Sequence, residues 1–193
     1  MNTHLFAVPG KLDRATTSNG ASTAWLATVG RLERTTIADP AIRVLQRAVR
    51  ALPPGELRDL LRGGPLGHPA HPMLVQVPIG CWLSAAVLDV APTGRGAPAA
   101  LIAVGLVGIA PAAVAGWVDW ADLPPDQARV GLVHALTNVA AVVFYSASLG
   151  ARLRGCSRRG KLWSLAGLTA IAASGLLGGH VAYHRTVARH LAT

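Results

Sequence analysis

Uncharged apolar runs dominate the last two thirds of the chain and determine the expected architecture. Four of these runs are long enough to cross a bilayer as helices: residues 72–90, 98–118, 130–150 and 162–183. At 1.5 Å per residue, each helix spans roughly 28–33 Å, which is close to the thickness of a hydrocarbon core. The short connections make neighbouring helices antiparallel. We therefore expect an all-α integral membrane four-helix bundle over residues 67–185.

A different pattern precedes the bundle. In residues 39–52, DPAIRVLQRAVRAL, apolar residues recur at helical spacing and arginines occupy other positions around the helical wheel. This pattern predicts a basic amphipathic helix on a membrane surface, with packing against a protein partner as the alternative. We assign residues 39–66 to interfacial helices. Residues 1–38 lack sustained periodicity and are expected to form a disordered tail, with a short C-terminal tail at 186–193.

Composition agrees with a membrane protein and argues against nucleic-acid-binding, disulfide-rich and iron–sulfur proteins. Hydrophobic residues make up 51% of the chain and charged residues only 14%, whereas soluble domains carry about 25% charged residues. The net charge of +9 comes from cations in the terminal segments and one loop, without interleaved aromatic residues. This arrangement suits anionic lipid and not nucleic acid. Cys81 and Cys156 are isolated, which argues against a disulfide framework or an iron–sulfur cluster.

The histidines gather on one membrane face, which we call side A and define as the face where the first span begins. Alternation of the four antiparallel helices places five of the seven histidines there: His68, His71, His134, His180 and His184. His134 and His180 lie at similar depths, roughly 5–6 Å inside the boundary. The sequence therefore predicts a histidine cluster near side A.

Further side chains are expected beside this cluster. Asn138 follows His134 by one helical turn on the same face. The rim of side A should also contain Trp117, Asp119, Trp120 and Arg185. Asp119 is suited to accept a hydrogen bond from a ligand histidine, whereas tryptophans at this depth have an ordinary alternative role as bilayer anchors.

Histidines in membrane spans favour a bound cofactor. Ionisable residues inside spans are uncommon and commonly functional, and neutral imidazole is a frequent metal ligand. Two facing histidines can hold a haem iron, while three or four can bind a non-haem metal. We expect b-type haem with His134 and His180 as axial ligands and His71 as the alternate ligand, His68 lying nearby. No HExxH motif or nucleophile–base pair indicates a stand-alone enzyme.

Two other classes of function stay open. The protein could be a non-catalytic membrane anchor or assembly module with a partner docked on side A. Non-haem metal binding or transport is less favoured, because we expect no polar residues to continue the path to the opposite face, side B. There, Asp89 is expected to pair with Arg95 or to cap a helix.

Four segments together resemble a known family. LGHPAHPMLVQVPIG at 66–80, GWVDW at 116–120, GLVHALTN at 131–138 and GGHVAY at 178–183 resemble, in order, the motifs of the bacterial multipass membrane domain of unknown function 2231. The resemblance covers about residues 40–185.

The resemblance implies electron transfer. Members of that family, mainly in actinobacteria, often carry a Rieske-type iron–sulfur domain after the fourth helix. A quinone or a Rieske-type protein is therefore the expected partner, and the family histidines map to His68, His71, His134 and His180. This sequence lacks a CxH…CxxH pattern, so a Rieske partner would be a separate chain.

Charge and topology together give an expected orientation. Both termini lie on side A, and the basic loops of side B would by themselves favour side B as cytoplasmic. However, the basic segment before the first span would then cross the membrane without a signal peptide. We therefore expect a multipass protein of the cell (inner or plasma) membrane with cytoplasmic termini.

Overall fold

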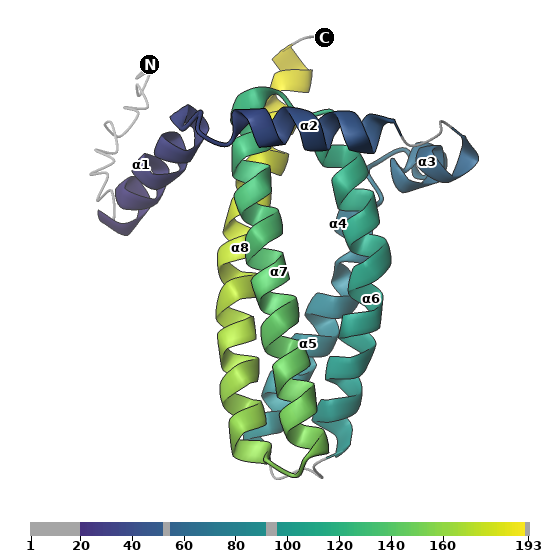
Figure 1. The fold of residues 1–193 in the computed structure, drawn as a ribbon, viewed down its shortest axis with the longest axis vertical. Coiled ribbons are helices and arrows are strands. Elements are labelled where there is room, and N and C mark those ends of the chain that lie inside the picture. Colours follow the sequence, from purple (N-terminus) through teal and green to yellow (C-terminus); the bar gives the residue numbers. More distant parts are fainter. Residues whose placement is uncertain (1–19, 52–54, 92–95, 192–193) are drawn as a thin grey trace, which may run out of the picture.

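The computed structural model describes the backbone of residues 20–51, 55–91 and 96–191, and this part of the chain is helical (Figure 1). Its elements are α1 (Gly20–Arg34), α2 (Asp39–Arg50), α3 (Glu56–Leu61), the 3-10 turn η1 (Gly64–Leu66), α4 (His71–Leu74), α5 (Gln76–Val90), α6 (Gly96–Trp120), α7 (Pro125–Leu153) and α8 (Ser157–Leu191). Four segments are long and apolar enough to cross a membrane: His71–Val90, Gly96–Trp120, Pro125–Leu153 and Ser157–Tyr183. The expected all-α membrane bundle is confirmed.

The first span consists of two helices because of a proline. Pro78 has no N–H to bond the carbonyl of Leu74, which is the last residue of α4. Regular bonding resumes around this point, with the Val75 N–H donating to His71 and the Ile79 N–H donating to Val75. The missing hydrogen bond of Pro78 therefore accounts for the α4–α5 junction.

The bundle consists of two tightly packed hairpins, α5–α6 and α7–α8, which make less extensive contact with each other. Trp82 of α5 stacks on Tyr145 of α7, with ring centroids 4.1 Å apart, and both side chains are buried. A Cβ atom on Gly105 would lie 2.3 Å from the Trp82 indole nitrogen, and one on Gly167 would lie 2.7 Å from the Tyr145 ring. Small residues thus allow the close helix contact expected in membranes.

Helix α2 lies across the side-A end of the bundle (Figure 1). Ile42 is buried with Trp120 and Leu123, and the Gln46 amide donates to the carbonyl oxygens of Trp120 and Leu123 at 3.3 and 3.1 Å. The apolar stripe expected to enter the membrane surface therefore packs, through Ile42, onto the protein's own α6–α7 turn. The sequence pattern revealed an amphipathic helix but not which surface its stripe would meet.

Helix α1 lies within the segment expected to be a disordered tail. Val29 is buried between Val130 of α7 and Leu177 of α8. One buried position every few residues is a weak signal in a sequence, which explains why the pattern there did not predict a helix. Residues 1–19 lie outside the described part. At the other end, α8 continues to Leu191, through most of the expected C-terminal tail.

Candidate functional site

His71 and His134 meet between the two hairpins near side A. Their ring centroids are 6.2 Å apart and their ring planes are nearly perpendicular, at 86°. The Nδ1 atom of His71 lies 2.8 Å from the carbonyl oxygen of Ala112 on α6, and Nδ1 of His134 lies 2.8 Å from that of Ser174 on α8. A carbonyl only accepts, so Nδ1 carries the proton in both rings and Nε2 is the basic nitrogen.

Both rings are seated against glycine backbones. A Cβ atom on Gly116 would lie 2.8 Å from Nδ1 of His71, and one on Gly178 would lie 2.8 Å from Cε1 of His134. Any larger residue at either position would displace the ring. Asn138, one turn from His134, places its amide nitrogen 3.1 Å from the Nε2 atom of that histidine. The amide donates there because Nε2 is the basic nitrogen.

The structure does not bring His134 and His180 together as the expected ligand pair. Gly178 faces His134, and a position two residues further along an α-helix points about 200° away. His180 accordingly contacts α1, where its Nε2 atom lies 2.8 Å from a carboxylate oxygen of Glu33. The sequence places the two histidines at similar depths, but the helical phase directs their rings to different neighbours.

The other expected residues are spread around the rim. His68 is exposed and lines a surface hollow together with Asp119. Trp120 is buried, and its indole N–H donates to the Ala128 carbonyl at 2.9 Å, so it is a packing residue of the α6–α7 turn. Trp117 packs edge-on against Trp120 with centroids 5.1 Å apart. The backbone of His184 and Arg185 belongs to α8, but their side chains lie outside the described part of the structure.

A second polar cluster, which the sequence did not predict, joins α5, α7 and α8 near side B. Asp89 pairs with Arg152 through two hydrogen bonds of 2.9 and 2.5 Å, whereas Arg95 lies outside the described residues. Arg152 also donates to the hydroxyls of Ser148 and Ser164 at 3.1 Å, and these hydroxyls are 2.8 Å apart. Asp89 is therefore part of a buried network with Arg152, and its expected pairing with Arg95 stays a prediction.

Polar side chains do continue along the inward face of α7, contrary to the expectation of an apolar path. Asn138, Tyr145, Ser148 and Arg152 follow His134 at steps that keep to one side of a helix. The buried Tyr145 hydroxyl has no hydrogen-bond partner among the described atoms. This spacing is visible in the sequence, but only the positions of α5 and α8 show which partners the polar groups meet.

Ion pairs attach α1 and α2 to the bundle at side A. Arg129 forms two hydrogen bonds of 2.7 Å with the Asp39 carboxylate and also donates to the Glu33 carbonyl. The hydrogen bond from Arg129 lowers the pKa of Asp39 below its ordinary value. Together with the Glu33–His180 contact, these bonds fix the start of α2 and the end of α1 beside the histidine region.

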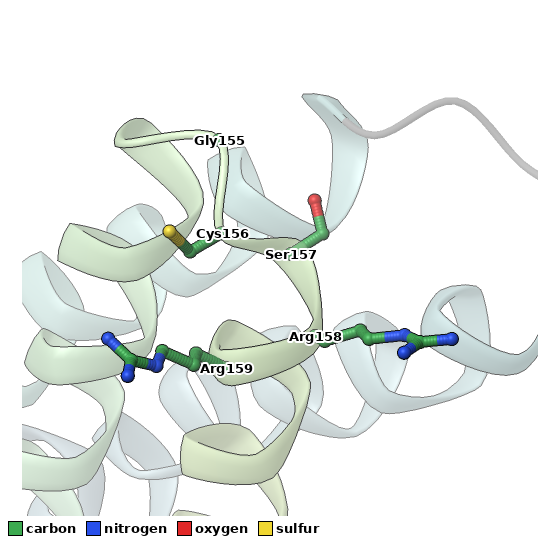
Figure 2. A pocket seen from close by; sticks show the side chains of 5 residues that line it. All are labelled: Gly155, Cys156, Ser157, Arg158 and Arg159. Atoms are coloured by element: carbon green, nitrogen blue, oxygen red, sulfur yellow. The ribbon is translucent and has the colours of Figure 1, made fainter.

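On side B, a shallow hollow lies at the start of α8 (Figure 2). Arg158 and Arg159 extend from it in opposite directions, and Cys156 is an exposed free thiol. Because the two side chains point apart, their guanidinium groups cannot bind one small anion together. Across the described residues, no group of three or more His, Cys, Asp or Glu side chains is arranged to hold a metal ion.

Comparison with known proteins is consistent with this picture. No curated protein and no solved structure shows a significant match to the chain. The family model described as "Predicted membrane protein (DUF2231)" matches residues 67–190, which include all four spans and both histidines of the pair. The chain is an integral membrane protein that belongs to the DUF2231 family.

Proposed function

We propose that His71 and His134 would hold the iron of a haem and that the protein transfers electrons in the membrane. The observation that carries this proposal is the pair of neighbouring rings, with centroids 6.2 Å apart, each anchored through Nδ1 to a backbone carbonyl of a neighbouring helix. Such a second hydrogen bond fixes the tautomer and orientation of ligand histidines. The pair replaces the expected ligand pair of His134 and His180.

The number of ligands favours haem over a non-haem metal. Protein sites for zinc or non-haem iron use three or four side chains, and the described residues offer no such group. The macrocycle of haem supplies the remaining ligands, so two histidines suffice.

Haem binding requires two local changes. Asn138 must release Nε2 of His134, which it now contacts at 3.1 Å. The hairpins must also separate around the macrocycle, and their contact with each other is smaller than the contact within each hairpin. A quinone in the bilayer or a Rieske-type protein on side A would then be the electron partner, since the pair lies nearer to side A.

Absorption spectra of the purified protein test the proposal. Protein produced with ample haem should show a Soret band that shifts on reduction with dithionite, together with one iron per haem. His71→Ala and His134→Ala should each abolish the band. His180→Ala is the matched control and should retain it, because His180 contacts Glu33. A colourless wild-type protein under these conditions would refute haem binding.

A second function, a membrane anchor or assembly module, is favoured by one observation. Both ring nitrogens of His134 already have partners inside the protein, in Ser174 and Asn138. A ring pair with such partners can join the two hairpins without any cofactor. In that case, the alanine variants at His71 and His134 lower the stability of a protein that is colourless throughout.

We also propose that side A faces the cytoplasm in a cell (inner or plasma) membrane. Cys156 tests this orientation, because it is an exposed thiol in the turn between α7 and α8 on side B. A membrane-impermeant maleimide should label Cys156 in intact cells with an accessible outer surface, and Cys156→Ser should remove the label. Labelling only after the cells are opened would reverse the orientation.

A further inference from the structure

Exposed apolar residues occur not only on the four spans but also on the helices that surround the side-A end of the bundle. We call α1, α2, α3, η1 and their connections, residues 20–66, the collar. Its exposed large apolar side chains are Leu26, Ile37, Val44, Leu45, Leu57, Leu60 and Leu66. Leu57 and Leu60 are three residues apart on one face of α3 and are 70% and 51% exposed. So many exposed apolar groups indicate a surface that is covered in the membrane.

The exposed surface of α1 and α2 is basic, whereas α3 exposes the acidic residues Glu56 and Asp59. Arg31, Arg34, Arg43 and Arg47 are all exposed. The acidic groups close to them in sequence are engaged elsewhere, because Glu33 contacts His180 and Asp39 is held by Arg129. The exposed charge of α1 and α2 is therefore cationic.

The position of the collar indicates what covers it. Helices α1 and α3 extend to opposite sides of the bundle at side A, with α2 between them (Figure 1). They therefore lie beside the spans, next to the lipid that the spans must contact. The spans carry exposed apolar side chains of their own, such as Met73 and Val114, and must contact lipid. The position of α1 and α3 beside the spans therefore favours the bilayer as the occupant of this surface.

We propose that the collar is a binding surface for anionic phospholipid of the side-A leaflet. Its leucines enter the interface between headgroups and acyl chains, and its exposed arginines contact the phosphate groups. Ile42 does not take part, because the end of the bundle covers it. The lipid-binding surface thus consists of α1, α3 and the outward side of α2, and it is independent of any cofactor at His71 and His134.

Quenching of a probe on the collar tests the proposal. Cys81 and Cys156 are replaced by alanine, and Ile37→Cys, at a position 88% exposed, carries a bimane label. The protein is placed in phosphatidylcholine nanodiscs with a small, equal content of nitroxide-labelled phosphatidylglycerol or nitroxide-labelled phosphatidylcholine. Each arginine near the surface enriches anionic lipid roughly fivefold, so phosphatidylglycerol should quench several-fold more strongly.

Two double variants that lose the same charge distinguish lipid binding by the collar from attraction of anionic lipid by the net charge of the protein. Arg43→Gln/Arg47→Gln should reduce the excess of quenching by phosphatidylglycerol over phosphatidylcholine several-fold, and Arg31 and Arg34 should maintain the remainder. Arg158→Gln/Arg159→Gln, which removes two exposed arginines on side B, should leave the preference unchanged. Equal quenching by both lipids in the unmodified collar overturns the preference for anionic lipid. Absence of quenching by either lipid overturns the membrane contact and indicates an occupant from the aqueous phase.

Discussion

The buried ion pair of Asp89 and Arg152 should be strongly coupled. Their side chains are 10% and 6% exposed, and two hydrogen bonds join them. Removing one partner of such a pair leaves an uncompensated charge and costs about 3–5 kcal/mol, whereas replacing both by apolar residues is often neutral. We therefore expect Arg152→Met and Asp89→Leu each to lower the free energy of unfolding by about 3–5 kcal/mol. The double variant should lie close to wild type.

The neighbouring hydroxyls do not change this expectation. When Arg152 is removed, Ser148 still donates to the Gly160 carbonyl at 2.7 Å and remains 2.8 Å from Ser164. The cost of Arg152→Met should therefore come from the isolated Asp89 carboxylate. Equilibrium unfolding in mixed micelles, measured for both single variants and the double variant, gives the coupling free energy directly.

An exposed ion pair provides the control. Arg62 lies 2.6 Å from Asp122, with both side chains about 40% exposed, at 40% and 43%. Such a pair contributes about 0–1 kcal/mol, so Arg62→Gln should have little effect. If Arg152→Met also costs less than about 1 kcal/mol, water reaches the pair and the reasoning from burial is wrong. Additive losses in the double variant would equally contradict the coupling.

Two further predictions follow from local geometry. Gly178→Ala should displace the His134 ring and lower the free energy of unfolding by about 1–3 kcal/mol through overpacking. A Cβ atom on Gly179 meets nothing within 4 Å, so Gly179→Ala should lower this free energy much less. Both variants can be measured by equilibrium unfolding in the same mixed micelles. The lowered pKa of Asp39 means that its bond with Arg129 stabilises the fold above the ordinary aspartate pKa and is lost as pH falls through the lowered value. The protection factors of amides at the start of α2, which correct for the intrinsic pH dependence of hydrogen exchange, should therefore fall on acidification, and Asp39→Asn should make them low throughout this pH range.

The polar positions show how far the sequence predicts the site. Antiparallel spans place His71 and His134 on side A, and the structure agrees because this conclusion needs only the number of spans. Which rings meet depends on the rotation of each helix about its axis. Gly178 turns one face of α8 towards His134, and the same rotation turns His180 towards Glu33. In a membrane span, apolar residues occupy all sides of the helix, so their pattern in the sequence does not show which side faces the other helices.

The sequence by itself determined the class of protein and the four spans, because transfer of long apolar runs into a bilayer depends on composition and length alone. It also indicated the face on which the histidines gather and the amphipathic character of residues 39–52. The tertiary structure decided the partners: Arg152 for Asp89, the bundle end for Ile42, and α1 for His180. These contacts join residues far apart in the chain, and they depend on helix rotation and packing, which the hydrophobic pattern leaves undetermined.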